Sequence, residues 1–215
     1  MAKETTDREK ELMENFIIAV KDVFNLEIDE KTYKETTAEK FVSLKKALSN
    51  INNIVTLKIT NLFIEKLCGD EFISNVQKDE MIENSNKQKA NANGYDVEYP
   101  DPKKKSNEEN PINILAEVKC NIPVGDKQFG SAQKAGILKD IEGLLNGEKK
   151  LKSEAKVGSY FKFMVFMDYE DENQNHNVRN SVETLLKNTS YKNNVKYYDG
   201  KCQLDNDHVY IIFIS

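Results

Sequence analysis

Apolar residues in the first third of the chain recur at the spacing of an α-helix. After a charged lead-in they return every three or four positions over residues 12–24, and again over residues 41–67. This spacing places them on one face of a helix. Gly69 and Asp70 end the second stripe, so the pattern predicts several helices before residue 70. The two stripes contain Leu12, Met13, Phe16, Ile17, Val20, Phe24, Phe41, Leu44, Leu48, Ile51, Ile54, Val55, Phe63 and Leu67.

Residues 70–93 show no clear period. The segment "QKDEMIENSNKQKANAN" within them is polar and rich in Asn and Lys, which favours a loop or a marginal helix over a core element. We therefore expect residues 1–93 to form an N-terminal helical region that packs on or extends the core. Residues 94–215 are expected to form the core itself, within one compact domain overall.

After Gly94 the pattern changes to the alternation of β-strands. "YDVEY" (95–99) and "INILAEVKC" (112–120) both alternate, and the polar segment between them begins and ends with proline. Proline fits neither a helix interior nor a central strand. Two strands around one polar connection predict an antiparallel hairpin with a long loop.

The hairpin brings acidic residues together. If the chain turns within residues 101–110, Asp96 and Glu117 lie opposite each other to within about one residue, with Cβ atoms about 5 Å apart. Side chains repeat every second residue, so Asp96, Glu98, Glu117 and Lys119 share one face. The opposite, packed face is expected to carry Tyr95, Val97, Tyr99, Ile114, Ala116, Val118 and Cys120.

The rest of the chain predicts a mixed sheet. Ser131 is expected to cap a helix that Asn146-Gly147 ends, and "YFKFMVFM" (160–167) is apolar enough for a strand covered on both faces. A short helix follows near Val178–Leu186, and residues 195–198 and 208–215 are expected as strands. The fold class is therefore α/β (α+β), with a mixed central β-sheet flanked by helices.

Composition narrows the range of functions. No apolar run is long enough for a membrane span and the charged start does not resemble a signal peptide, so we expect a cytoplasmic protein with no membrane partner. Three distant cysteines predict neither a disulfide framework nor a thiolate zinc site. The net charge of −5 argues against indiscriminate coating of nucleic acid.

Crowded carboxylates on one face of a hairpin resist joint ionisation. A hard divalent cation resolves the crowding, because Mg²⁺ prefers oxygen ligands and binds through one or two carboxylates. Lys119 could orient an attacking water or offset charge on a phosphate. The alternative is a solvated strand edge, in which Glu117 or Lys119 forms a cross-strand ion pair contributing less than about 1 kcal/mol.

These residues resemble the signature of the PD-(D/E)XK nucleases, a superfamily that contains many type II restriction endonucleases. The similar features are Asp96, the hairpin-length gap and Glu117-Val118-Lys119, within residues 94–168. The resemblance implies a restriction-endonuclease-like core and Mg²⁺ as cofactor, with Mn²⁺ as a substitute. It implies that Asp96 and Glu117 bind the metal, with the Val118 carbonyl as a further ligand, and that Lys119 assists the attacking water.

The sequence departs from this signature in two places. Tyr95 stands where the family often has proline, whereas a Pro-Asp pair occurs at Pro100-Asp101. Asp96 is preferred, since Asp101 lies between two prolines within the connection; Asp101 and Glu98 stay as additional acidic candidates. The strand that usually precedes the hairpin has no clear counterpart in residues 70–93.

The function implied is that of a Mg²⁺-dependent endonuclease of the type II restriction type, hydrolysing phosphodiester bonds of double-stranded DNA. A small enzyme of this kind is expected to act as a homodimer, with the N-terminal helices as its contact or as a cover for the sheet. The alternatives are a nuclease of the same fold with a repair, junction or RNA substrate, and a non-enzymatic protein-interaction domain. The candidate DNA contacts lie before or within the first turn of the helix at Ser131: Lys127, Gln128, Ser131, Gln133 and Lys134.

Overall fold

The structure is a computed structural model, and it describes residues 7–48, 50–88, 94–101, 106–123, 128–147, 151, 156–171 and 176–215. The chain divides into two compact units, Met1–Ile51 and Asn52–Ser215. The first unit holds three helices, and the second holds a five-stranded sheet with the helices that cover it.

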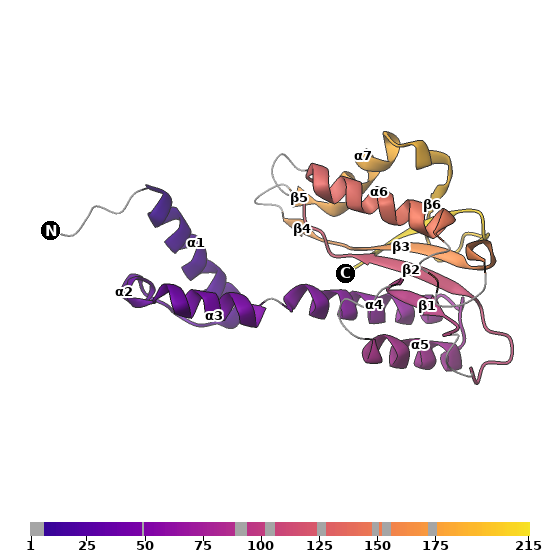
Figure 1. Ribbon diagram of the computed structural model, residues 1–215, viewed down its shortest axis with the longest axis horizontal. Helices are drawn as coiled ribbons and strands as arrows, with labels where there is room; N and C mark the ends of the chain where they lie inside the picture. The colour runs from indigo at the N-terminus through magenta and orange to yellow at the C-terminus, as the bar shows by residue number, and fades with distance from the viewer. Residues whose placement is uncertain are drawn as a thin grey trace. The chain divides into compact units, whose positions relative to one another are not determined.

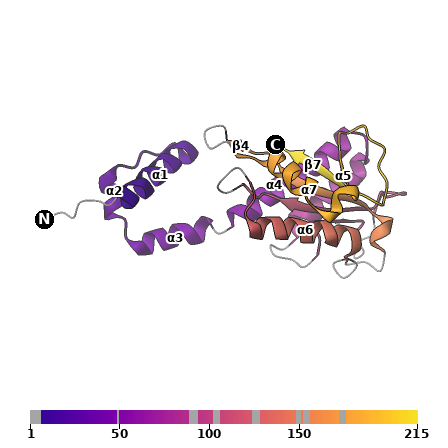
Figure 2. The same cartoon turned by 90° about the horizontal axis from the view of Figure 1, so that it is seen from above.

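The first unit is joined by a cluster of three aromatic rings. Its helices are α1 (Asp7–Phe24), α2 (Glu30–Glu35) and α3 (Ala38–Leu48) (Figure 2). Each contributes one ring, from Phe16, Tyr33 and Phe41, and the three ring centroids lie 5.4–5.8 Å apart. The predicted helices in residues 12–24 and from Phe41 onward are confirmed.

The sheet of the second unit is mixed, and its strand order is β1-β2-β3-β7-β6 (Figure 1). Only the β1–β2 pair is antiparallel within this sheet; β2, β3, β7 and β6 run parallel to their neighbours. Its strands are β1 (Val97–Tyr99), β2 (Ile114–Lys119), β3 (Phe161–Met167), β6 (Val195–Tyr197) and β7 (Val209–Ile214). Two short strands, β4 (Glu170–Asp171) and β5 (His176–Asn177), form a separate ribbon.

Helices cover both faces of this sheet (Figure 1). One face carries α6 (Ser131–Asn146) and α7 (Val178–Lys187), and the other carries α4 (Ile51–Gly69) and α5 (Asn75–Lys87). Short 3-10 turns lie at Val157–Ser159 and Ser190–Asn193. Because both faces are buried, β3 is apolar almost throughout, as expected for a central parallel strand. The predicted fold class, a mixed sheet flanked by helices, is confirmed.

The apolar core has two layers. The layer toward α4 and α5 includes Ile59, Phe63, Ile64, Leu67, Met81, Val97, Phe163 and Tyr210. The layer toward α6 and α7 includes Leu115, Ile137, Ile141, Leu144, Met164, Phe166, Val182 and Ile211. Among the described residues, no helix combines the length and the apolar character needed to cross a bilayer.

Within residues 70–93, where we expected a loop or marginal helix and no core element, residues 75–87 form the helix α5, and its Met81 lies in the core. Ser74 caps this helix by accepting a hydrogen bond from the Gln77 N–H at 3.0 Å. The buried Gln77 side chain then bonds both backbone groups of Ile112, with distances of 3.1 and 2.7 Å. These hydrogen bonds to a distant segment, together with the buried Met81 side chain, fix α5 in place.

The predicted boundary at residues 93/94 also differs from the division of the chain, which falls at 51/52. The reason is packing: α4 and α5 bury apolar side chains such as Phe63 and Met81 in the same core layer as Phe163 of β3. Both helices therefore belong with the sheet.

The predicted cap of α6 is wrong by one residue. Gly130 is the N-cap and Ser131 is the first helical residue. A glycine has no side chain to cap with, and the Gln133 side chain accepts from the Gly130 N–H at 2.9 Å. The helix ends at Asn146 with Gly147 as its C-cap, as the Asn146-Gly147 pair predicted.

Candidate functional site

The β1–β2 hairpin has the register that the sequence predicted. Val97 pairs with Ala116, Glu98 with Leu115 and Tyr99 with Ile114. Asp96 immediately precedes β1, and continuing the same register by one residue places it opposite Glu117. The two acidic residues are therefore neighbours across the hairpin, at the end of β2 that leads to Lys119.

The two faces of the hairpin are also as predicted, except for Tyr95. Val97 and Tyr99 pack with Ile114, Ala116 and Val118 in the layer toward α4 and α5. Tyr95 was expected with them, but it lies in the layer toward α6 and donates its hydroxyl to the carbonyls of Gly143 and Gly147, at 2.6 and 3.1 Å. The chain bends at Asp96 before β1 begins, so the alternation does not extend back to Tyr95.

The surroundings of the Asp96 carboxyl group shift its pKa. Its Oδ2 accepts a hydrogen bond from the Val118 N–H at 2.7 Å. Burial raises the pKa of the Asp96 carboxyl above its usual 3.8, and the nearby Asp140 carboxylate raises it further. The Val118 N–H, the Lys119 charge and a side-chain hydrogen bond with Glu117 act in the opposite direction without cancelling the rise in pKa.

Lys119 is held by an acidic residue that the sequence analysis missed. Its Nζ lies 2.5 Å from Oδ2 of Asp140 on α6, and the two side chains are only 20% and 15% exposed. The sequence did contain a signal. Asp140 follows Ile137 by three residues and precedes Leu144 by four, so it lies on the same face of α6 as these buried residues.

Four charged side chains therefore surround the end of β2: Asp96, Glu117, Asp140 and Lys119. Three carboxylates against one ammonium leave two negative charges uncompensated when all are ionised. Glu117 is only 6% exposed, and a carboxyl pair in hydrogen-bond contact needs a shared proton or a cation. This donor set fits a divalent cation with oxygen ligands.

The backbone next to Glu117 suits the same ion. The N–H and C=O of one strand residue point to the same neighbouring strand. Since the Val118 N–H points to Asp96, the Val118 carbonyl points to that side as well. The described residues contain no group of three or more His, Cys, Asp or Glu side chains that could hold a metal; two carboxylates, a carbonyl and waters are a sufficient set for Mg²⁺.

The additional acidic candidates lie at different distances along the hairpin. Glu98 is 8% exposed and, opposite Leu115, lies on the same face as Glu117. Asp101 lies beyond the Tyr99–Ile114 pair, at the far end of the hairpin from Glu117. The structure thus brings Asp96 to Glu117 and Lys119, but not Asp101.

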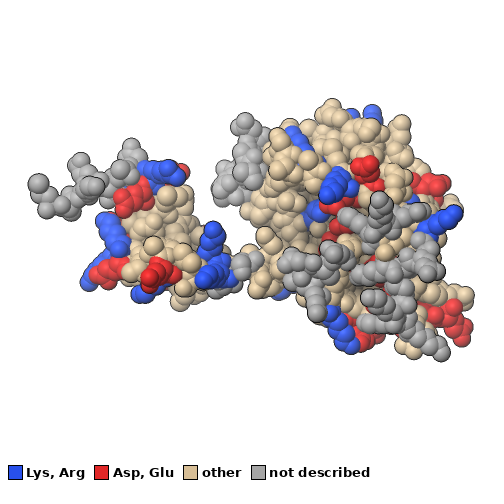
Figure 3. All heavy atoms as spheres, in the orientation of Figure 1, with Lys and Arg blue, Asp and Glu red and all other residues tan. Residues whose placement is uncertain are grey.

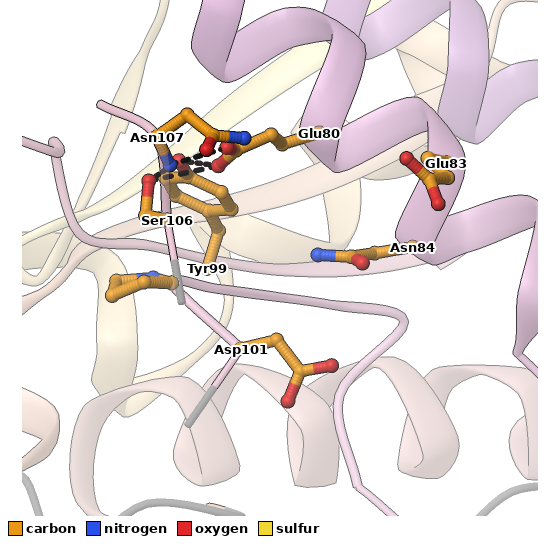
Figure 4. A pocket seen from close by; sticks show the side chains of 8 residues that line it. Glu80, Glu83, Asn84, Tyr99, Asp101, Ser106 and Asn107 are labelled. Atoms are coloured by element: carbon orange, nitrogen blue, oxygen red, sulfur yellow. Dashed lines mark hydrogen bonds between the residues drawn. The ribbon is translucent and has the colours of Figure 1, made fainter. Parts of the chain in front are cut away.

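Asp101 instead lines a hollow of about 200 Å³ between α5 and the segment after β1, together with Glu83 and Asn84 (Figure 4). At one side of this hollow, Glu80 accepts hydrogen bonds from the Tyr99 hydroxyl at 2.6 Å and from the Asn107 N–H at 2.6 Å. These bonds fix the connection that precedes β2. The Asp101 side chain points away from this group.

The candidate DNA contacts gather at the start of α6, which follows the carboxyl end of β2. Gln133 is committed to the cap, because its amide also donates to the Ile122 carbonyl at 3.0 Å. Lys134 Nζ lies 3.3 Å from the side-chain oxygen of Gln128, and both Gln128 and Ser131 are exposed. Lys127 lies outside the described residues.

Charge on the surface is mixed. On the face of the second unit drawn in Figure 3, acidic and basic side chains of the described residues are interspersed. Comparison of the chain with protein-family models, with curated proteins and with solved structures finds no match. The geometry of the carboxylates therefore carries the functional interpretation.

Proposed function

We propose that this protein is a Mg²⁺-dependent endodeoxyribonuclease of the type II restriction type, which hydrolyses phosphodiester bonds of double-stranded DNA. The observation that supports it is the Asp96–Glu117 pair, in contact across the β1–β2 hairpin, with Lys119 two residues farther along the same face. The restriction-endonuclease-like core is part of this proposal.

Each residue has a distinct part in the reaction. Asp96, Glu117 and the Val118 carbonyl would hold Mg²⁺, or Mn²⁺ as a substitute, and the ion would supply polarisation of the scissile phosphate and make a water easier to deprotonate. Lys119 Nζ donates a hydrogen bond that orients the attacking water or offsets the charge that develops on the phosphate. Burial of the Glu117 carboxylate strengthens its hold on a cation, because the surroundings screen the charge less than water does.

The substrate approaches the carboxyl end of β2, where α6 begins. Backbone N–H groups at a helix N-terminus attract phosphate, and the exposed Gln128 and Ser131 side chains, with the half-buried Lys134, extend this contact. Lys127 is a further candidate.

The working form is a homodimer in the cytoplasm. The first unit leaves many large apolar side chains more than half exposed, and a partner copy would cover them. These side chains belong to Leu12, Ile18, Val23, Phe24 and Leu26. Three cysteines without disulfide partners suit a reducing compartment.

The proposal is tested by incubating the purified protein with plasmid DNA and Mg²⁺. We expect discrete fragments, and each of Asp96→Asn, Glu117→Gln and Lys119→Met should slow cleavage by about 10²-fold or more, since each removes several kcal/mol of transition-state stabilisation. Circular dichroism should show unchanged folding.

Asp101→Asn is the matched control, because it removes a carboxylate from the same hairpin at its far end, and it should cut normally. If Asp101→Asn is inactive and Asp96→Asn is active, the choice of acidic residue is wrong. A smear of products would indicate a nuclease with a repair, junction or RNA substrate. No cleavage with either metal would favour a non-enzymatic interaction protein.

A further inference from the structure

We infer that Asp140 is a positioning residue, whose carboxylate holds the Lys119 ammonium beside the Asp96–Glu117 pair. This inference rests on the proposed function, because it assigns a role in the same site to a residue that the nuclease signature does not contain. It depends on three features of the structure: the contact between the side chains, their burial, and their origin on different elements.

The contact joins two elements that are separate in sequence. Lys119 is the last residue of β2, whereas Asp140 lies in the middle of α6, and the charged atoms are 2.5 Å apart. Ile137 and Ile141 anchor this part of the helix in the core. Core packing therefore fixes the position of Asp140, and the ion pair in turn fixes the position of the Lys119 ammonium group.

Burial distinguishes this pair from the surface pairs of the chain. Lys10–Glu14 and Lys187–Glu183 join residues four apart on one helix, and their side chains are about half exposed or more. Pairs of that kind contribute little, because solvent screens them. The Lys119 and Asp140 side chains are 20% and 15% exposed, so losing one partner leaves a poorly solvated charge.

A lysine at the end of a strand needs such an anchor. Its four-carbon side chain loses rotamer entropy when it is fixed. Nearby carboxylates offer competing partners, since Asp96 also feels the Lys119 charge. Asp140 selects one position for the ammonium and leaves the oxygens of Asp96 and Glu117 for a cation. Without it, the lysine would compete with the cation for those oxygens.

The test compares Asp140→Asn and Asp140→Glu with the unchanged protein. Asp140→Asn should lower kcat by roughly 10–100-fold, as for other groups that orient residues of a metal site, with little change in KM for plasmid DNA. Asp140→Glu should recover part of kcat, because it restores the charge. Asp70→Asn is the control, since it breaks a half-buried pair with Lys66, at 2.9 Å, at the C-terminal end of α4 and away from the site.

A second measurement does not depend on cleavage. Lysines are acetylated with a water-soluble amine reagent, and the modification of each is quantified by mass spectrometry. Lys119 should react slowly in the unchanged protein and several-fold faster in Asp140→Asn, whereas the exposed Lys139 serves as the internal reference. The Asp70→Asn control should leave Lys119 unchanged.

The outcomes separate the two proposals. Unchanged reactivity of Lys119 in Asp140→Asn overturns the inference whatever the activity. Raised reactivity with unchanged kcat also overturns it, because the ion pair is then merely structural. If the unchanged protein cuts no DNA, the nuclease proposal fails, while the acetylation result still decides whether Asp140 holds Lys119.

Discussion

Asp96 and Asp205 lie near opposite ends of the parallel strands, and the pKa values of their carboxyl groups are shifted in opposite directions. Asp96 lies near the carboxyl end of β2, whereas Asp205 precedes β7, whose first residue pairs with Lys162 near the start of β3. Burial acts to raise the pKa of both. Asp205 nevertheless has a pKa well below its usual value because hydrogen bonds from His208 and Lys196 outweigh burial, whereas the pKa of Asp96 stays raised.

The difference lies in the number of donors. The Asp205 carboxylate accepts from the Asp207 and His208 N–H groups at 3.0 and 3.1 Å, contacts the His208 ring at 2.6 Å and pairs with Lys196 at 2.9 Å. Asp96 accepts from the Val118 N–H and faces other carboxylates.

A carboxylate whose own chain supplies its donors is typical of a structural residue. A carboxylate crowded by other carboxylates indicates a residue kept for a ligand. The two ends of the same sheet thus differ: Asp205 has several hydrogen-bond donors, whereas Asp96 faces other carboxylates.

Metal binding beside Asp96 should produce the greatest change, an increase in the free energy of unfolding. A ligand that binds one site of the folded state adds about 2.7 kcal/mol at a concentration one hundred times Kd. For a chain of this size that raises Tm by about 5–10 °C. Scanning fluorimetry with Mn²⁺ should show this shift in the unchanged protein and in Asp205→Asn, but not in Glu117→Gln. An equal shift in Glu117→Gln would place the metal elsewhere.

A smaller change, a loss of stability, should follow when the Asp205 carboxylate is removed. Asp205→Asn removes the charge that Lys196 and His208 contact, which should lower the free energy of unfolding by about 1 kcal/mol once solvent screening is allowed for, or Tm by about 2–4 °C. Because the pKa of Asp205 is lowered in the folded state, this stabilisation is present above about pH 4 and is lost as the pH falls. The two proteins should therefore converge in acid; a constant difference from pH 7 to pH 3 would contradict the comparison.

The smallest change is expected from Asp96→Asn, which should raise the stability of the metal-free protein rather than lower it. The pKa of Asp96 is raised from 3.8 in the folded, metal-free protein, so its contribution to stability is present below about pH 4 and is lost as the pH rises through the folded value. Asp96→Asn removes this loss. Urea unfolding in EDTA should show the variant to be slightly more stable at pH 7 and equal near pH 4. A variant less stable at pH 7 would show that Asp96 is satisfied within its own chain.

The sequence predicted the hairpin better than what surrounds it. Strict alternation and a proline-bounded connection left little freedom in register, so Asp96 and Glu117 could be paired in advance. Tyr95 was misplaced because a bend at Asp96 interrupts the alternation. The alternation of apolar and polar residues predicts how the two strands of the hairpin pair, and the prediction fails where the alternation stops.

Contacts between distant segments were harder to predict. α5 depends on the Gln77 amide bonding the backbone of Ile112, which leaves no periodic trace in the sequence. Asp140 contacts Lys119 because α6 packs over β2. In the sequence, this contact is indicated by the three-residue spacing from Ile137, which places Asp140 on the buried face of the helix. These contacts depend on how helices cross the sheet.

A crystal structure obtained with Mn²⁺ decides whether Asp96 and Glu117 together hold a divalent cation. Anomalous scattering should reveal one ion between the two carboxylates, about 2.0–2.3 Å from an oxygen of each, with Lys119 beside it and not bound to it. Two carboxylates that share no ion at saturating Mn²⁺, or an anomalous peak beside Asp205 instead, would rule out this metal site.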